Sequence, residues 1–326
     1  MSLPFLPPPT QQIDSAIARH AGVELSVLRL DLMHSWVNGN KWFKLKYNLL
    51  QAKEENYTTL LTFGGAYSNH IYATAAAGNL FGLQTIGVIR GEENLPLNPT
   101  LDFAVQQGMQ LVYIDRDTYR QRNTIKLQED LRQLFGKVFI IPEGGSNLNG
   151  VRGCTEIINQ EMEFDTICVA CGTATTLTGI TLSLHPKQRS LGFPVLKNGG
   201  FLAQEINQML TDYLASSLPT LHNSPAPWEL VCNYHFSGYA KVNKELLLFT
   251  QQFTQEHGIP LDYVYTAKMF YGVMDLLKQG FFSRGERLLL VHTGGLQGNT
   301  CRLRGKGEGE RGKKKPLTFT PNPMPS

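Results

Sequence analysis

The sequence has few cysteines and no long apolar run, and each absence excludes a class of protein. Only five of the 326 residues are cysteine, and an odd, sparse set argues against a framework of disulfide bonds. No apolar run approaches the ~20 residues that span a bilayer, so we expect no membrane partner. The first ten residues are rich in proline and lack a basic region followed by an apolar one. We therefore expect no signal peptide and a cytoplasmic location.

Two of the cysteines, Cys168 and Cys171, have the CxxC spacing of redox and zinc sites. A structural zinc site usually needs a second pair of ligands, and the sequence offers no second CxxC and no nearby pair of histidines. The stretch 167–170 is apolar and typical of a buried strand. We therefore favour core packing over a redox or metal role, and we expect no metal site.

The net charge of +3 hides an uneven distribution along the chain. Residues 299–326 contain seven basic and two acidic residues, so the other 298 residues carry a net charge of −2. A slightly acidic body gives no sign of a nucleic-acid surface, and we expect no nucleic-acid partner. The tail 299–326 is rich in glycine, lysine, arginine and proline, which predicts disorder. An arm for nucleic acid or an anionic surface and a translated scar of a frame change are open alternatives for it.

Strand-like and helix-like segments alternate along the chain, which predicts an α/β fold with parallel sheets covered on both faces. Two successive αβα units account for the pattern. The strands are expected at 28–32, 58–62, 85–89, 111–114, 138–141, 166–170, 192–196, 229–233 and 287–292. The helices are expected at 11–21, from 41 onward, and at 72–80, 98–107, 118–135, 151–161, 177–184, 202–214, 242–257 and 266–279.

Three glycine-rich turns follow predicted strands, at 64–65, 172–176 and 294–295. Loops at the carboxyl ends of parallel strands are where open α/β sheets bind ligands. Gly172–Thr176 opens a helix, so its backbone N–H groups can hold an anion. It lacks the lysine of a Walker loop and does not match GxGxxG, which disfavours a nucleoside triphosphate or a dinucleotide. A terminal phosphate monoester is the better ligand.

A second chemical signal comes from Lys41, which stands where a loop opens a helix. A lysine at such a junction can be held rigidly and partly desolvated. Desolvation lowers the pKa of an ammonium group, and a neutral amine can form a Schiff base. We expect the neighbouring Lys44 and Lys46 to be solvated surface charges.

A reactive lysine, a phosphate-binding turn and a parallel sheet together suggest pyridoxal 5'-phosphate. From about Leu28 to Gly298 the sequence resembles the aminocyclopropanecarboxylate deaminase and D-cysteine desulfhydrase family of pyridoxal-phosphate enzymes, which has the tryptophan-synthase-β-like fold (fold type II). Six motifs in family order carry the resemblance. They are Gly39–Leu45, Gly64–Asn69, Pro142–Asn147, Gly172–Thr176 with Gly179, Val264–Lys268 and His292–Gly295.

The resemblance implies two αβα three-layer domains with mostly parallel sheets. Residues 1–43 and 147–298 are expected to form a larger cofactor domain, and residues 44–146 a smaller αβα domain. We expect a homodimer that acts on a small amino-acid substrate.

The resemblance also assigns the site. Lys41 is expected to hold the cofactor as a Schiff base, and Asn69 to form a hydrogen bond with the cofactor's phenolic oxygen. Ser68 is expected near the substrate carboxylate or as a base or nucleophile, and Tyr239 and Tyr265 as the two active-site tyrosines. Further cofactor contacts are expected from Gly172, Thr173, Ala174, Thr175, Thr176, Thr266 and Thr293, and substrate contacts from Ser68, Asn69, His70 and Tyr265.

Two positions discriminate reactions within this family. Members that open a cyclopropane ring carry glutamate at the position of Thr266 and leucine at that of Thr293, whereas desulfhydrase-like members carry small hydroxyl residues. The sequence therefore favours α,β-elimination of D-cysteine or a related D-amino acid to pyruvate, ammonia and hydrogen sulfide. His70, Trp42 and Phe43 depart from the usual family residues. Aminocyclopropanecarboxylate deaminase, D-serine dehydratase, a β-replacement enzyme and an inactive cofactor-binding paralogue are the alternatives.

Overall fold

The computed structural model describes residues 5–159, 161–220, 222, 224–299 and 312–314. The chain divides into two compact units, a larger one of residues 1–48 and 145–299 and a smaller one of residues 49–144 and 300–326. The boundaries expected from the sequence, after 43 and after 146, stay a prediction. None of the helices in the described residues is long and apolar enough to cross a membrane.

The larger unit is built on a six-stranded, mostly parallel sheet in the order β1-β2-β11-β8-β9-β10. Only β1 is antiparallel to its neighbour. Every residue of β8 is buried, as in a sheet covered on both faces. The strands are β1 Thr10–Gln12, β2 Glu24–Arg29, β8 Thr166–Cys171, β9 Arg189–Pro194, β10 Trp228–Leu230 and β11 Arg287–His292.

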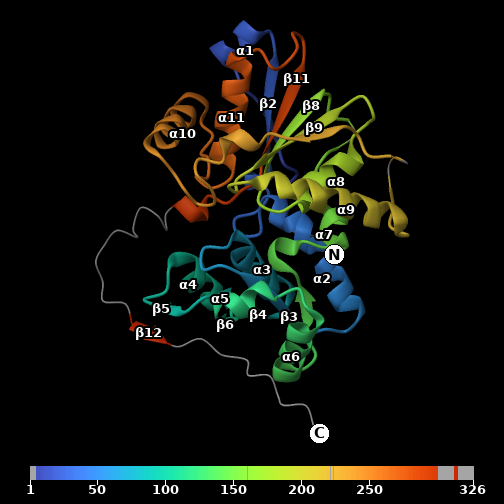
Figure 1. The fold of residues 1–326 in the computed structure, drawn as a ribbon, viewed down its shortest axis with the longest axis vertical. Coiled ribbons are helices and arrows are strands. Elements are labelled where there is room, and N and C mark those ends of the chain that lie inside the picture. Colours follow the sequence, from blue (N-terminus) through green and yellow to red (C-terminus); the bar gives the residue numbers. More distant parts are fainter. Residues whose placement is uncertain (1–4, 160, 221, 223, 300–311, 315–326) are drawn as a thin grey trace. The chain divides into compact units, whose positions relative to one another are not determined.

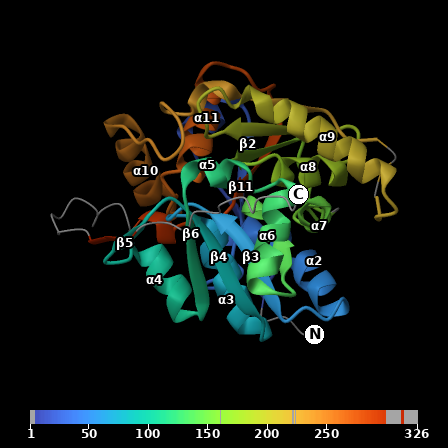
Figure 2. The same ribbon diagram turned by 60° about the horizontal axis from the view of Figure 1, so that its bottom comes forward.

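Helices cover both faces of this sheet (Figures 1 and 2). One layer contains α1 Ala16–Ala21, α10 Lys244–His257 and α11 Thr266–Lys278, with α11 against β8 and β9. The other layer contains α7 Leu148–Cys154, α8 Thr175–Ser183 and α9 Leu202–Ala215, with α8 against the same strands. The helix α2 Asn40–Glu54 begins in this unit. The 3-10 turns of the chain are η1 Leu30–Leu32, η3 Gly199–Phe201 and η4 Cys232–Tyr234 in this unit and η2 Glu143–Gly145 at the boundary between the units.

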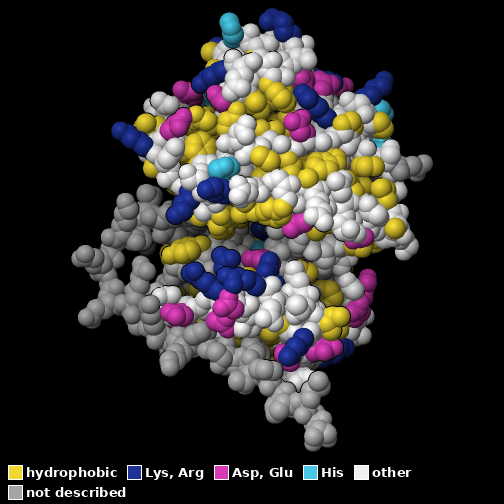
Figure 3. Space-filling model, viewed as in Figure 1, with side chains coloured by type: hydrophobic (Ala, Val, Ile, Leu, Met, Phe, Trp, Pro, Cys, Tyr) yellow, Lys and Arg dark blue, Asp and Glu magenta, His cyan; other side chains and the backbone are white. Residues whose placement is uncertain are grey.

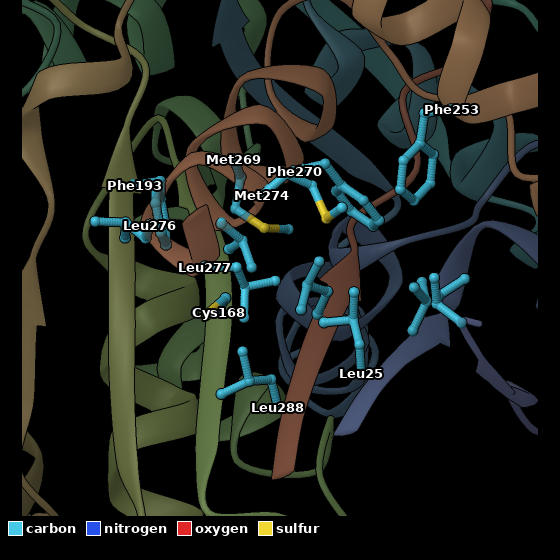
Figure 4. Packing of buried hydrophobic residues seen from close by; sticks show 14 of the residues in the cluster. Leu25, Cys168, Phe193, Phe253, Met269, Phe270, Met274, Leu276, Leu277 and Leu288 are labelled. Atoms are coloured by element: carbon cyan, nitrogen blue, oxygen red, sulfur yellow. The ribbon is translucent and has the colours of Figure 1, made fainter. Parts of the chain in front are cut away.

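The main apolar core of the larger unit lies between the sheet and the α11 layer (Figure 4). Phe270 on α11 is fully buried, and its ring meets Phe253 edge-on with centroids 5.1 Å apart. Strand residues Leu25, Cys168 and Leu288 face this helix. The packing fixes α11, the helix that begins at the predicted site motif 264–268.

The smaller unit has a four-stranded parallel sheet in the order β6-β4-β3-β7. The strands are β3 Thr59–Gly64, β4 Gln84–Arg90, β6 Met109–Ile114 and β7 Phe139–Ile141. One face packs on α3 Asn69–Phe81 and α4 Pro99–Gln106, the other on α5 Arg116–Arg120 and α6 Ile125–Phe135. Both units are thus αβα layers with mostly parallel sheets, and the predicted fold class is confirmed.

Figure 3 shows lysine and arginine side chains gathered on one part of the smaller unit. In this unit, Arg90 and Arg122 both lie against the ring of the buried Tyr119, at 5.6 and 5.2 Å from its centroid. Arg122 also pairs with Glu143 at 2.8 Å. Part of the positive charge is therefore balanced within the unit.

Several predicted elements differ from the structure. The expected helix 11–21 starts as the edge strand β1 and becomes helical only at Ala16, because β1 pairs with β2. The expected helix 118–135 is two helices, since Thr124 caps a new start by accepting a bond from the Leu127 N–H. Of the predicted disordered tail, the structure describes only Asn299 and the strand β12 Gly312–Lys314, which pairs with β5 Glu93–Leu95. The rest of that tail lies outside the described residues.

We predict that Phe270→Ala lowers the free energy of unfolding by about 3–5 kcal/mol, because it leaves a cavity in the core of the larger unit. The control is Phe281→Ala, whose side chain is 40% exposed and should cost about 1 kcal/mol or less. Urea unfolding followed by circular dichroism measures both. Equal losses in the two variants would contradict this account of the core.

Candidate active site

The segment before α2 and the loop after β11 pack backbone against backbone. Gly39 has a φ of 63°, and a Cβ there would lie 2.0 Å from the carbonyl oxygen of Thr293. Gly294 has a φ of 75°, and its Cβ would lie 2.5 Å from Asn38 Oδ1. Only glycine fits at either position. The two predicted motifs 39–45 and 292–295 therefore hold each other in place.

Lys41 lies on the first turn of α2, and its Nζ donates to Asn40 Oδ1 at 2.8 Å. The pKa of Lys41 falls from 10.5 to about 7, chiefly because burial disfavours the ammonium and also because Lys44 repels it. A lysine with this pKa is partly neutral at neutral pH. It can therefore attack a carbonyl carbon, as the sequence predicts.

The turn 172–176 joins β8 to α8 and faces the first turn of α2. Asn40 Nδ2 donates to Thr176 Oγ1 and Lys44 Nζ to Thr173 Oγ1, both at 2.9 Å. The N-cap residue of α8, Ala174, supplies no side-chain cap, so the first N–H groups of this helix can bind a ligand. Helix N–H groups, hydroxyls and an ammonium together make a site for a phosphate group.

The expectation that Lys44 is a solvated surface charge is wrong. Its side chain is buried, with 3% of the residue exposed, and burial lowers its pKa. Residues three apart on a helix lie on the same face, so Lys44 follows Lys41 toward the turn 172–176. Lys46 lies elsewhere on the helix and pairs with Glu156 while 26% exposed. The spacing of Lys41 and Lys44 was the signal that the sequence interpretation did not use.

Asp262 fixes the start of α11, and the sequence interpretation missed it. Its buried carboxylate accepts bonds from the N–H groups of Tyr265 and Thr266 at 2.7 and 2.8 Å. Its own N–H donates to Thr266 Oγ1 at 2.8 Å. Burial raises the pKa of Asp262, and the two N–H bonds oppose that rise. Asp262 lies four residues before α11, outside the N-cap position that Tyr265 holds, so the ordinary capping pattern does not reveal it.

The two predicted tyrosines lie together. Tyr265 Oη donates to Tyr239 Oη at 3.3 Å, and Lys41 Nζ is 5.9 Å from the centroid of the Tyr265 ring. The same ring packs on Gly172, where a Cβ would come within 2.7 Å of it. The larger unit therefore brings Lys41, the turn 172–176 and both tyrosines into one cluster.

A buried ionic group supports the loop that carries Thr293. Arg29 donates to the two oxygens of Asp31 at 2.9 and 2.7 Å. His292 is fully buried, with Nδ1 3.2 Å from Asp31 Oδ1 and Nε2 2.8 Å from Pro260 O. This group ties the ends of β2 and β11 together immediately before Thr293.

Three predicted site residues, Ser68, Asn69 and His70, belong to the smaller unit. Ser68 is the N-cap of α3, and its Oγ accepts bonds from the N–H groups of His70 and Ile71. Asn69 opens the helix. His70 is buried, with Nε2 2.9 Å from Thr62 Oγ1 on β3. Their contacts with cofactor or substrate stay predictions.

The CxxC cysteines lie inside β8. Cys168 and Cys171 are 0% and 1% exposed, and burial raises the pKa of Cys171 to about 12. This placement agrees with core packing. Within residues 5–299, apart from 160, 221 and 223, no group of three or more histidine, cysteine, aspartate or glutamate side chains could hold a metal.

Comparison with known proteins finds relatives that match most of the chain. The family described as "Pyridoxal-phosphate dependent enzyme" matches residues 7–294. A protein of Pyrococcus horikoshii, provisionally named 1-aminocyclopropane-1-carboxylate deaminase, is 33% identical over 292 residues, covering 86% of this chain and 87% of its own. The mitochondrial bifunctional D-cysteine desulfhydrase/1-aminocyclopropane-1-carboxylate deaminase of Arabidopsis thaliana is 30% identical over 300 residues, covering 85% of this chain and 73% of its own. The crystal structure of an ACC deaminase homologue superposes with a TM-score of 0.76 and 28% identity, covering 91% of this chain and 92% of that chain.

The residues of the larger unit fit pyridoxal phosphate. Its aldehyde needs a lysine that is partly neutral, and Lys41 has a pKa of about 7. Its phosphate needs an anion site, and the turn 172–176 offers one beside the buried ammonium of Lys44. Lys41 and Lys44 lie near the start of α2, and the turn 172–176 leads into the start of α8.

We predict that apoenzyme incubated with pyridoxal phosphate and then reduced with borohydride carries the pyridoxyl group on Lys41. The rate of capture should rise between about pH 6 and 8 and then level off, because the neutral fraction of Lys41 grows as the pH passes its lowered pKa. Peptide mapping locates the adduct. Lys46→Met is the control and should still carry the pyridoxyl group on Lys41. An adduct on Lys44 or Lys46 in the unmodified protein would contradict the assignment.

We also predict that Thr173→Val with Thr176→Val, and separately Lys44→Met, raise the Kd for pyridoxal phosphate about 10–100-fold, since each removes hydrogen bonds to a charged group. Equilibrium dialysis of the apoenzyme measures the Kd. The chemical step at saturating cofactor should change less than the Kd. Lys46→Met is the matched control, and an unchanged Kd in the folded variants would refute the phosphate site.

Proposed function

Because the chain belongs to the pyridoxal-phosphate-dependent enzymes and, within them, to the family of 1-aminocyclopropane-1-carboxylate deaminases and D-cysteine desulfhydrases, we propose that it is a lyase for D-cysteine or a related D-amino acid. The reaction breaks the Cβ–S bond and converts D-cysteine and water to pyruvate, ammonia and hydrogen sulfide. Pyridoxal phosphate, when bound, supplies the aldehyde that takes up the amino group and the ring that withdraws electrons from Cα.

Lys41 is the proposed base in this reaction. Its Nζ is partly neutral, with a pKa of about 7, so it can accept the proton from Cα at neutral pH. Asn40 Oδ1 accepts a bond from Nζ at 2.8 Å and so orients it. Lys44 and the turn 172–176 would hold the phosphate, which would leave Lys41 alone of the two lysines for proton transfer.

The tyrosine pair is the proposed second proton path. Tyr239 and Tyr265 have their hydroxyl oxygens 3.3 Å apart, within reach of a proton passed between them. The Tyr265 ring centroid is 5.9 Å from Lys41 Nζ, and Tyr239 is 42% exposed. We propose that they orient the substrate and carry a proton between it and solvent.

The observation that carries the choice of elimination is the bonding of Thr266. Its Oγ accepts a good bond from the Asp262 N–H, whereas its contacts as a donor, to O and Oδ1 of Asp262, are long at 3.3 and 3.4 Å. We propose that these long bonds give way to a shorter one when an unprotonated pyridine nitrogen is offered as the acceptor. An unprotonated ring withdraws electrons more weakly, which suits a reaction whose thiolate leaves at once.

Ring opening of aminocyclopropanecarboxylate is the second candidate, and Asp262 favours it. The Asp262 carboxylate is 3.4 Å from Thr266 Oγ. It therefore brings negative charge close to position 266, although that position holds no glutamate. Burial raises the pKa of Asp262 and weakens that effect. The names of the relatives support both reactions equally.

The remaining assignments stay predictions. They are cofactor or substrate contacts of Ser68, Asn69, His70 and Thr293, and a homodimeric assembly.

We predict sulfide release from D-cysteine with little or no 2-oxobutanoate from aminocyclopropanecarboxylate. Thr266→Glu with Thr293→Leu should lower elimination at least about tenfold, because a carboxylate keeps the ring nitrogen protonated, and should raise ring opening. Sulfide and 2-oxo acid assays on the purified holoenzyme measure both. Thr266→Ser, which keeps the hydroxyl, is the control. Faster release of 2-oxobutanoate than of sulfide by the unmodified enzyme would overturn the proposal.

A further inference from the structure

Tyr239 lies in a loop with an unusual backbone. Four of the five residues 236–240 have a positive φ, namely Phe236 at 49°, Ser237 at 65°, Gly238 at 115° and Ala240 at 61°. Residues other than glycine rarely adopt this conformation, because their Cβ crowds the backbone. A loop with three such residues needs contacts that hold it in this shape.

Those contacts come from Lys268 on the first turn of α11. The residue is 1% exposed, and its Nζ donates to the carbonyl oxygens of His235 at 2.9 Å and Gly238 at 2.7 Å. The same two oxygens accept the turn hydrogen bonds of the loop, from Gly238 N–H at 3.0 Å and Lys241 N–H at 3.1 Å. One buried ammonium thus closes two successive turns.

Two further contacts fix the preceding segment on the same face of α11. Gly272 lies one turn after Lys268, and a Cβ there would come 2.8 Å from Cδ2 of Tyr234. Asp275, another turn on, accepts a bond from Tyr234 Oη at 2.8 Å. Residues 268, 272 and 275 share one helical face. Because Tyr265 is the N-cap of the same helix, α11 sets the positions of both tyrosines.

We propose that Lys268 is a positioning residue whose ammonium fixes the loop 235–240 and so keeps the Tyr239 hydroxyl beside that of Tyr265. An ammonium suits this task because it has three donors and no acceptor, and it faces carbonyl oxygens. Without it, the loop is free to leave the left-handed conformation. We call the two hydrogen bonds from Lys268 Nζ to the His235 and Gly238 carbonyl oxygens the clamp. The clamp rests on these contacts alone, and its effect on the reaction rests on the proposed function of Tyr239.

Hydrogen exchange of the holoenzyme tests the clamp independently of any substrate. In Lys268→Met, the amides of Gly238 and Lys241 should exchange roughly tenfold faster or more, because their turns open locally. Lys278→Met, an exposed position at the end of the same helix, is the control and should change neither amide. Should Lys268→Met fail to fold, Lys268→Gln, which has a shorter reach, should lose part of the same protection. Unchanged protection in the folded variant overturns the proposal.

A double-mutant cycle tests whether Lys268 acts through Tyr239. We expect Tyr239→Phe and Lys268→Met each to lower kcat for sulfide release about tenfold or more, since a misplaced group loses most of its effect. The double variant should be no slower than Tyr239→Phe alone. Multiplied losses overturn the proposal. An unchanged kcat in Tyr239→Phe refutes the proposed use of this tyrosine instead, and hydrogen exchange then still decides the clamp.

Discussion

The site depends on two lysine side chains one helical turn apart, Lys41 half-buried and Lys44 buried. Lys41 and Lys44 both lie on the first turn of α2, and among the residues that the structure describes neither pairs with a carboxylate. Charges in an apolar environment are costly unless they are compensated. An amide oxygen and a hydroxyl compensate them only in part. We propose that a cofactor phosphate at the start of α8 would supply the missing negative charge, and the lowered pKa of Lys41 relieves the rest. Anion binding and a neutral, nucleophilic lysine are therefore two consequences of the same electrostatic constraint.

The rest of the larger unit keeps that turn in position through contacts that tolerate little change. Gly39 and the Thr293 carbonyl leave no room for a Cβ, and neither do Gly172 and the Tyr265 ring. Asp262 fixes the start of α11 through two N–H bonds. These contacts join loops at the carboxyl ends of β8 and β11 to two helix starts. Parallel strands bring such loops to one edge, which explains why motifs far apart in sequence form one site.

The sequence predicted elements whose pattern is local and missed those that depend on a partner. Strand β11 has the predicted bounds, 287–292, because its apolar run is continuous. Strand β1 was missed because three polar residues become a strand only by pairing with β2. Lys41 lies at the start of α2 and the turn 172–176 joins β8 to α8, while their roles in the site stay predictions; the burial of Lys44 and Lys268 was not predicted. The neighbouring helix or loop decides whether a lysine faces solvent or the interior, and the amino-acid composition does not indicate this.

The buried lysines also show how one residue type serves different chemistry. Lys268 Nζ donates hydrogen bonds to two carbonyl oxygens, whose partial negative charges suit a donor with no acceptor. For Lys41, burial and then the like charge of Lys44 lower the pKa to about 7 and favour the neutral amine, although the negative charge of Asp262 opposes this. The first arrangement makes a rigid tie, and the second makes a nucleophile and base. Burial and neighbouring charge lower the pKa of Lys41, and a lysine motif alone cannot distinguish the two roles.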